Sequence, residues 1–340
     1  SSAASDVYKR QVHIIVRIVK KGGIDMIRWG ILGLGNIAKR FMQGLAYFDD
    51  ASLYAIASYT AKKREEFVHE HPDVIAYDDY HALLDDKNID AVYIAMRHND
   101  HYQWAKEALM KGKAVLCEKP ATLSLNQTQE LCYLAIQNHT FFMEAMKTRF
   151  IPLIDDIKKE LDSGVIGDIL NIETYFCSDV PYQPQHYLFD EKQGGALYDV
   201  GIYNVASTLD YIHSPLVKVR ANCKKNYGVD VHDVFHLTFE NGQKARIEIA
   251  IDEKKAKKMV ITGTKGKLIA EPFYRPVQAT IITDEQRVIE KPYMNDNDFY
   301  GEIAEVHRCL KEHLIESERM SFQDSILCMK VIEDMKESCA

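Results

Sequence analysis

A glycine-rich turn between a short apolar run and a helical pattern constrains the fold of this chain most strongly. Residues 27–32 are apolar and lead directly into GLGNIA at 33–38, which fits the pattern G-x-G-x-x-A between a strand and a helix. Gly33 permits a tight turn, Gly35 lets a pyrophosphate approach the backbone, and Ala38 lets the helix pack close to the sheet. The motif therefore predicts a dinucleotide site rather than a purely structural turn. The residues expected to hold the cofactor here are Gly33, Gly35, Asn36 and Ile37.

Strand and helix patterns alternate from this turn to residue 146. Apolar runs at 53–57, 89–95, 114–117 and 141–146 read as strands, and the first helix is expected at 36–47. Further helices are expected at 62–70, 101–111 and about 127–137. Such alternation predicts a parallel, doubly wound α/β sheet, so residues 26–146 are expected to form a Rossmann domain.

The pattern changes after residue 150, where strand-like segments dominate. One helix is expected at 153–162 and two more at about 301–313 and 322–337, the last with Ser321 as its N-cap. Strands are expected at 169–176, 217–223, 233–239, 245–251 and 259–261. Residues 246–251 alternate polar and apolar side chains, which suits an antiparallel sheet with one face in water. Residues 147–340 are therefore expected to form a second, α+β domain.

Charge and cysteine usage narrow the classes of function. The net charge of −8 gives no basic surface for nucleic acid or for anionic lipid. No apolar run is long enough to span a membrane. The seven cysteines are scattered without a C-x-x-C pair, so neither a disulfide framework nor a metal site is expected, and a reducing cytoplasm fits best.

Residues 1–25 read differently from the rest of the chain. Their short apolar run is interrupted by Arg17, and they lack the apolar core and cleavage site of a signal peptide. We interpret them as a non-native or poorly packed leader; an extra strand is the alternative.

The end of the second predicted strand bears on the choice of cofactor. NAD enzymes usually carry an acidic residue there, but residues 57–60 read ASYT and residues 62–64 read KKR. Ser58 and Lys63 could hold a 2′-phosphate, so NADP(H) is favoured and NAD(H) stays possible. The alternative is that the lysines form an ordinary solvated helix face.

Five further sequence blocks carry a family resemblance. They are WGILGLGNIA (29–38), DAVYIA (90–95), GKAVLCEKP (112–120), MEAMKTRFIP (143–152) and GGALYDVGIY (194–203). Over residues 27–338 the chain resembles the glucose–fructose oxidoreductase/inositol dehydrogenase/MocA family. It is most similar to the dihydrodiol dehydrogenase and NADP-linked D-xylose dehydrogenase branch.

That resemblance implies hydride transfer between a nicotinamide and a carbinol carbon of a sugar, cyclitol or diol. It also implies a large, largely open β-sheet in the second domain, through which a homodimer or homotetramer would form. The lysine of the family's E-K-P motif corresponds to Lys119, and the acid and tyrosine of D-x-G-x-Y correspond to Asp199 and Tyr203. A base must take the hydroxyl proton as hydride leaves, a role that suits Lys119 with Tyr203.

Each of these three residues also has a structural reading. Lys119 could be a surface lysine, Asp199 a helix cap or salt-bridge partner, and Tyr203 a core tyrosine.

Several positions depart from the family pattern and bear on the substrate. His98 stands where asparagine is common, Lys147 where diol dehydrogenases tend to have tryptophan, and Tyr187 where arginine is common. Lys147 would favour a polar or acidic substrate, and His98 and Glu118 are expected beside the cofactor. The remaining candidates for the substrate pocket are Arg149, His186, Tyr182 and Phe273.

Two other functions compete with a dehydrogenase or reductase. A glycosidase or lyase on this fold would cycle a tightly held nicotinamide without net change in its reduced form. A cofactor-sensing regulator would need no catalytic lysine, so the presence of Lys119, Asp199 and Tyr203 argues against it.

Overall fold

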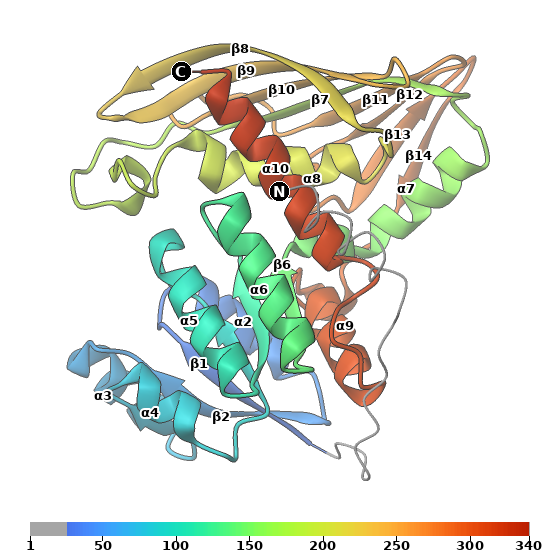
Figure 1. Ribbon diagram of the computed structural model, residues 1–340. Coiled ribbons are helices and arrows are strands. Elements are labelled where there is room, and N and C mark those ends of the chain that lie inside the picture. Colours follow the sequence, from blue (N-terminus) through green and yellow to red (C-terminus); the bar gives the residue numbers. More distant parts are fainter. Residues whose placement is uncertain (1–25, 340) are drawn as a thin grey trace.

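The computed structural model describes residues 26–339, so the predicted leader lies outside the described residues. Two sheets, joined by helices, form the molecule (Figure 1). The first contains β3 (Ile75–Tyr77), β2 (Ala51–Ala57), β1 (Ile27–Leu32), β4 (Ala91–Ile94), β5 (Ala114–Glu118) and β6 (Phe142–Ala145) in that spatial order. All neighbouring pairs are parallel. This is the strand order of a Rossmann domain, which confirms the prediction for this part of the chain.

The helices of the first domain are α2 (Asn36–Leu45), α3 (Ala61–Glu70), α4 (Tyr80–Asp85), α5 (His98–Met110) and α6 (Leu125–Gln137). The sequence analysis missed β3 and α4 because both are too short for a periodic pattern. A local cap supports α4, since the Asp79 carboxylate accepts hydrogen bonds from the amides of His81 and Ala82. Helix α5 begins at His98, three residues before the predicted start, which brings His98 to the carboxyl edge of the sheet.

The second sheet has the order β14-β13-β12-β11-β7-β10-β9-β8. Its strands are β7 (Ile169–Cys177), β8 (Leu216–Asn226), β9 (Val229–Phe239), β10 (Lys244–Ala250), β11 (Met259–Gly263), β12 (Lys267–Ala270), β13 (Gln278–Ile282) and β14 (Gln286–Glu290). Only β7 and β10 pair in parallel, so the sheet is mostly antiparallel, as predicted. Strands β12 to β14 were missed because each has only four or five residues.

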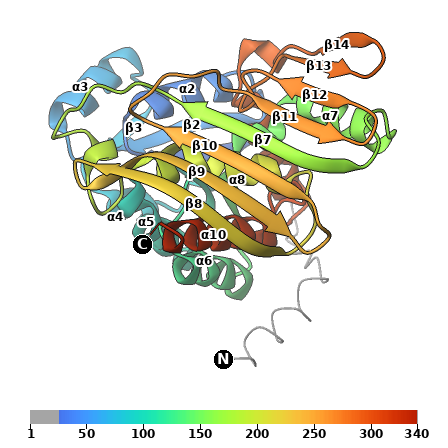
Figure 2. The same cartoon turned by 90° about the horizontal axis from the view of Figure 1, so that it is seen from above.

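One face of this sheet packs on helices and the other is open. Strands β7 and β10 contact α8 (Ile202–Leu209), and β8 contacts α10 (Phe322–Glu337). In β10 the inward side chains Ala245, Ile247 and Ile249 are buried, as the predicted alternation requires. No described helix covers the opposite face, which is turned toward the viewer in Figure 2.

Helix α8 and the π-helical turn before it, η3 (Leu197–Gly201), were not predicted. Together they form a helical segment in which every residue except Asp199 is buried, and its two parts are short, with five and eight residues. It has a functional consequence, because Asp199 lies in η3 and Tyr203 in the first turn of α8.

The remaining helices return the chain to the first sheet. Helix α7 (Pro152–Asp162) follows the 3-10 turn η1 (Lys147–Phe150), and α9 (Tyr300–Lys311) packs against α2. The indole of Trp29 in β1 donates a 3.0 Å hydrogen bond to Nε2 of His307 in α9. Ser321 caps α10 in a capping box with Asp324, as predicted. The second predicted domain therefore contacts the first through its C-terminal helices. None of the described helices is long and apolar enough to cross a membrane.

One cysteine pair departs from the sequence-based expectation. Cys223 and Cys339 form a disulfide across 116 residues of sequence, with their Cα atoms 5.7 Å apart. The scattered spacing gave no sign of this pair, because β8 and the end of α10 meet only in the folded chain. The other five cysteines are buried and free.

Candidate active site

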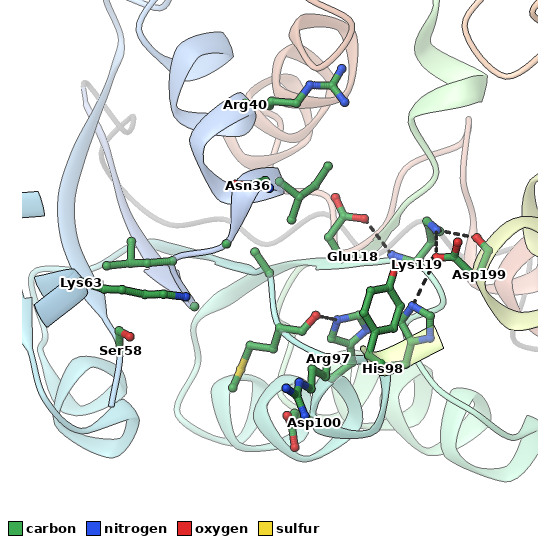
Figure 3. Close-up of a pocket in the computed structure, with 18 of the residues that line it drawn as sticks. Asn36, Arg40, Ser58, Lys63, Arg97, His98, Asp100, Glu118, Lys119 and Asp199 are labelled. Atoms are coloured by element: carbon green, nitrogen blue, oxygen red, sulfur yellow. Dashed lines mark hydrogen bonds and ion pairs between the residues drawn. The ribbon is translucent and has the colours of Figure 1, made fainter. Parts of the chain in front are cut away.

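A cavity of about 770 Å³ lies at the carboxyl edge of the first sheet. Loops that follow β1, β2, β4 and β5 line one side, and η3 and α8 contribute Asp199 and Tyr203. This edge is where open α/β sheets bind ligands. Figure 3 shows that Ser58 and Lys63 lie at one end of the cavity, whereas Lys119, Asp199 and His98 lie at the other.

The glycine turn fits the phosphates of a dinucleotide. Gly33 has a φ of +93°, and a Cβ atom there would lie 2.5 Å from the carbonyl oxygen of Ala95, so only glycine suits the position. Nothing lies within 4 Å of a Cβ built on Gly35, which leaves room for a ligand to approach the backbone. No side chain caps the N-terminus of α2, so its first amides face the cavity side without a side-chain acceptor. Asn36 and Ile37 line the same cavity.

The end of β2 offers positive charge and no carboxylate. Ser58 is buried, and its Oγ accepts a 3.3 Å hydrogen bond from the amide of Thr60. The Arg64 guanidinium donates to the carbonyl oxygen of Ser58. Lys63 lines the cavity and forms no ion pair with a described residue, whereas Lys62 pairs with Glu66 at 3.8 Å. The two predicted phosphate ligands, Ser58 and Lys63, therefore both line the cavity.

Lys119 connects the two sheets at the other end of the cavity. It follows β5, and its Nζ donates a 2.6 Å hydrogen bond to the carbonyl oxygen of Asp199. The same Nζ lies 3.4 Å from Oδ1 of Asp199 and 4.6 Å from the centre of the Tyr203 ring. The three residues that the family resemblance singled out are thus neighbours, although 80 residues separate Lys119 from Asp199.

The Asp199 carboxylate is held in its charged form. Burial would raise its pKa, but the positive charge of Lys119 and the hydrogen bonds to the carboxylate together outweigh burial, and the pKa is lowered. The phenol of Tyr187 adds to this effect by donating a 3.0 Å hydrogen bond to Oδ1. Tyr187 is therefore part of the site. The sequence singled it out only because it stands where the family commonly has arginine, and it gave Tyr187 no role.

His98 is buried and neutral near pH 7. Burial and the nearby Lys119 lower its pKa from 6.5 to about 4. Its Nδ1 lies 3.0 Å from the carbonyl oxygen of Gln193, which can only accept, so Nδ1 carries the proton. The unprotonated Nε2 lies 3.9 Å from Oδ1 of Asp199 and points to the same part of the cavity as Lys119 (Figure 3).

Tyr203 and Glu118 complete the buried polar groups at this end. Burial, together with the Glu118 and Asp199 carboxylates, raises the pKa of Tyr203 well above its ordinary value, so the phenol keeps its proton. Glu118 is buried, accepts a hydrogen bond from the Tyr93 phenol and lies 3.3 Å from the amide of Lys119. Both residues line the cavity.

Lys147 lines the cavity but does not present a free charge. Its Nζ lies 3.0 Å from Oδ2 of Asp298 and 4.7 Å from the centre of the Phe299 ring. Arg40, which also lines the cavity, donates to the other oxygen of Asp298. Arg40 was missed because it lies beyond the glycine motif, on the first helix. The expectation that Lys147 selects an acidic substrate is weakened by its ion pair.

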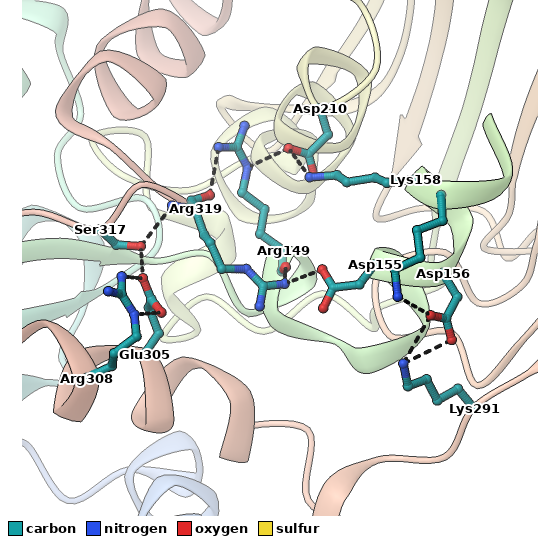
Figure 4. A network of polar contacts seen from close by, with 11 residues as sticks. Arg149, Asp155, Asp156, Lys158, Asp210, Lys291, Glu305, Arg308, Ser317 and Arg319 are labelled. Atoms are coloured by element: carbon teal, nitrogen blue, oxygen red, sulfur yellow. Dashed lines mark hydrogen bonds and ion pairs between the residues drawn. The ribbon is translucent and has the colours of Figure 1, made fainter. Parts of the chain in front are cut away.

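Arg149 lies outside the cavity, which corrects its predicted position in the substrate pocket. Its buried guanidinium lies 3.2 Å from Asp210 and 2.9 Å from Asp324 in a separate cavity of about 660 Å³. Figure 4 shows it beside Arg319 and Asp210, in a network of polar contacts. The opposed charges indicate a structural ion network rather than contact with substrate.

Three further pocket candidates are also placed elsewhere. His186 does not line the cavity; it stacks on Tyr187 with ring centres 4.8 Å apart. Tyr182 is exposed and stacks on Tyr227, and Phe273 is 1% exposed in the hydrophobic core. Tyr182 and His186 were predicted in the segment that does contribute Tyr187 to the cavity, but the sequence could not specify which of these side chains points inward.

Comparison with known proteins agrees with this geometry. Residues 27–146 match the model of an oxidoreductase family with an NAD-binding Rossmann fold, and residues 154–269 match the GFO/IDH/MocA C-terminal domain. The chain belongs to the Gfo/Idh/MocA oxidoreductase family. The resemblance on which the sequence analysis relied is therefore confirmed, as is the oxidoreductase class.

Similar members of the Gfo/Idh/MocA family match over almost their whole length. A trans-1,2-dihydrobenzene-1,2-diol dehydrogenase of Xenopus tropicalis is 29% identical, over 90% of this chain and 96% of that protein. A scyllo-inositol 2-dehydrogenase (NADP(+)) of Bacillus subtilis is also 29% identical, over 92% of this chain and 97% of that protein. The 3-ketoreductase KijD10 of Actinomadura kijaniata, solved with NADP and TDP-benzene, has a TM-score of 0.83 at 23% identity. It covers 92% of this chain and 98% of the KijD10 chain, and it supports the fold.

Proposed function

We propose that the protein is an NADP(H)-preferring dehydrogenase or reductase that acts on a hydroxyl-bearing carbon of a sugar, cyclitol or diol. One observation carries the proposal. The glycine turn and the Lys119, Asp199 and Tyr203 cluster line opposite parts of a single cavity. A dinucleotide held by its phosphates at Gly35 would therefore extend toward the part of this cavity where Lys119, Asp199 and Tyr203 lie together.

When bound, the nicotinamide would accept hydride from the substrate or supply hydride to it. The chain's own residues transfer the proton of the substrate oxygen. The Lys119 ammonium directs N–H groups at the carbonyl oxygen and Oδ1 of Asp199, which leaves one N–H for a substrate oxygen. Because its phenol keeps its proton, Tyr203 can donate that proton to the substrate oxygen during reduction. Oxidation is the reverse step, so it requires that the Lys119–Tyr203 pair has first lost one proton to solvent, which leaves a base for the hydroxyl proton.

The neighbouring groups orient this pair. Tyr187 and Lys119 fix the Asp199 carboxylate, and Asp199 in turn holds Lys119 in place. The neutral His98 offers Nε2 as an acceptor for a second substrate hydroxyl, since Nδ1 is occupied by Gln193. A site with several fixed donors and acceptors suits a polyol better than an apolar alcohol.

The preference for NADP(H) rests on the end of β2. No carboxylate stands there to bind the ribose hydroxyls or repel a 2′-phosphate, and Lys63, which lines the cavity, pairs with no carboxylate among residues 26–339. The scyllo-inositol dehydrogenase and KijD10 are named with NADP, which supports the same preference for this chain.

A substrate panel tests the proposed function. Aldoses, cyclitols, diols and glycosides are each incubated with NADP⁺ and, in parallel, with NAD⁺, and both the substrate consumed and the reduced nicotinamide formed are measured. We expect at least one compound to give one reduced nicotinamide per substrate consumed, faster with NADP⁺. Consumption of a glycoside without net reduction would instead identify a hydrolase or lyase that recycles its nicotinamide.

We also propose that the open face of the eight-stranded sheet joins copies of the chain into a homodimer or homotetramer in the cytoplasm. The face is broad, and no described helix covers it (Figure 2). Light scattering after gel filtration would test this, with a monomer at micromolar concentration as the contradicting result. Five of the seven cysteines are free, which fits a reducing compartment, whereas the Cys223–Cys339 disulfide does not.

A further inference from the structure

A second chemical cluster lies at the edge of the large sheet, away from the cavity just described. Cys223 in β8 and Asp233 in β9 are paired residues on adjacent antiparallel strands. Cys339 follows the end of α10 and meets them from the helical side of the sheet. One donor atom of each residue lies within 4.8 Å of the other two.

Asp233 is the unusual member of this cluster. Its side chain is 0% exposed, and neither carboxylate oxygen makes a hydrogen bond of good geometry with a described residue, although the Lys224 backbone and the Asp230 carboxyl group lie close to it. Burial and the adjacent Asp230 carboxylate raise its pKa to about 7. A buried carboxylate without a donor is costly, and such groups are normally paired with a cation or bound to a metal.

Among the described residues, no basic side chain pairs with Asp233, and the Asp230 carboxyl group is a close side-chain neighbour. Asp230 is itself acidic, and its Oδ2 already accepts a 2.7 Å hydrogen bond from the amide of Leu197. Lys224, the next residue along β8, pairs instead with Asp252 at 2.6 Å. The sulfur atoms of Cys223 and Cys339 also lie within 4.8 Å of a carboxylate oxygen of Asp233.

The three donors match the preferences of one class of ion. Two thiolates and a carboxylate bind Zn²⁺ well, because thiolates favour this borderline-soft cation and it accepts a carboxylate oxygen. Three protein ligands leave the fourth tetrahedral position for water. Cys223 and Cys339 are partly exposed, so an ion has a route to the cluster.

We propose that Cys223, Cys339 and Asp233 form a zinc site in the reduced protein, and that the disulfide is the metal-free, oxidised state of the same site. Oxidation removes two electrons from the two thiolates and joins the sulfur atoms, so that Zn²⁺ leaves unchanged. With hydrogen peroxide as oxidant, the two electrons and two protons convert the peroxide into two molecules of water. The disulfide and the metal therefore exclude each other.

The proposal differs from the expectation of no metal site, which rested on the absence of C-x-x-C spacing. The ligands come from three elements, and 116 residues separate the two cysteines, so no local motif could reveal them. The site also lies outside the cofactor cavity, since none of its three ligands lines that cavity.

Zinc content and affinity of the full-length protein test the proposal. The protein is reduced with a phosphine, loaded with Zn²⁺ alone, separated from free metal by gel filtration and analysed for bound zinc. Affinity is then measured by competition with a chromophoric chelator. The variants are Cys339→Ala and Asp233→Asn, and the matched control is Cys132→Ala, which removes a buried free thiol in α6. Thermal unfolding and NADPH binding verify that each variant is folded.

We expect one bound zinc per chain in the reduced wild type and in the control, and none in Cys339→Ala. Asp233→Asn should bind zinc at least about tenfold more weakly. Peroxide should release the zinc and lower the number of titratable thiols from seven to five. The proposal is wrong if the reduced wild type binds no zinc at micromolar concentration, or if Cys339→Ala binds as much as the wild type.

Discussion

The Nζ of Lys119 donates a 2.6 Å hydrogen bond to the backbone carbonyl oxygen of Asp199. This contact joins the end of β5 in the first sheet to η3 beneath the second sheet. A backbone acceptor holds the lysine without neutralising it, so the position of Nζ does not depend on the charge of the Asp199 side chain alone. The arrangement makes the relative placement of the two sheets part of the candidate active site.

Tyr187→Phe tests how Asp199 is held. The substitution removes the 3.0 Å hydrogen bond to Oδ1 and leaves the ring that contacts His98. Loss of one hydrogen bond to a charged group should lower kcat/KM about tenfold. The acidic limb of the pH–rate profile should also move to higher pH, because this hydrogen bond lowers the pKa of Asp199.

Tyr182→Phe is the matched control, since that phenol is exposed and outside the cavity. An unshifted acidic limb in Tyr187→Phe would show that the hydrogen bond does not act through Asp199.

Lys63→Ala tests the origin of cofactor preference. The wild type should bind NADPH more tightly than NADH, because a lysine and a phosphate form charge-assisted hydrogen bonds worth about 1.5–3 kcal/mol, or roughly 10–150-fold in affinity. Lys63 is exposed, which places the expected effect at the lower end. Fluorescence titration of both cofactors should show the variant losing affinity mainly for NADPH.

Lys62→Ala is the control here, since Lys62 pairs with Glu66 and does not line the cavity. Equal or tighter binding of NADH by the wild type would reverse the assignment and leave both lysines as a solvated helix face.

Arg149→Met separates a structural role from a substrate role. Removal of the guanidinium leaves the Asp210 and Asp324 carboxylates partly buried without their main partner, which should cost about 3–5 kcal/mol in the free energy of unfolding. Urea unfolding measures this cost, with Lys159→Met as an exposed control. A raised KM with unchanged stability would return Arg149 to the substrate pocket.

The lowered pKa of His307 should make the folded protein less stable in mild acid. Burial lowers its pKa from 6.5 to about 4, and its Nε2 must stay unprotonated to accept the Trp29 hydrogen bond. Between pH 6.5 and 4 the unfolded chain therefore binds a proton that the folded chain does not, so stability falls as pH drops through this window. His307→Gln keeps an acceptor for Trp29 and should reduce the difference in Tm between pH 7 and pH 5. An identical difference in both proteins would contradict this account.

The sequence predicted well wherever function depends on local pattern. The glycine turn, the strand before Lys119 and the missing carboxylate after β2 are all readable from consecutive residues, and the structure places each at the cavity. Asp199 and Tyr203 depended on the family resemblance, because the two helical elements that carry them have only five and eight residues and were not predicted. Their roles stay predictions until variants are measured.

The features of the structure that the sequence did not predict depend on how distant segments pack. Arg149 follows Lys147 by two residues in η1, yet the two side chains enter different cavities. Cys223 and Cys339 meet only because α10 ends against β8. Such relationships are set by the directions of side chains in a helical turn and by the lengths of helices, neither of which residue types alone specify.

The turnover of Lys119→Ala tests the central claim most directly. With a substrate that the wild type oxidises, and at saturating NADP⁺, the variant should form reduced nicotinamide about 10²-fold more slowly or worse, because the positioned proton carrier is lost. Its affinity for NADPH should change little, since the glycine turn and the end of β2 are untouched. A variant that keeps half of the wild-type turnover would contradict the assignment of Lys119 as the catalytic residue of this site.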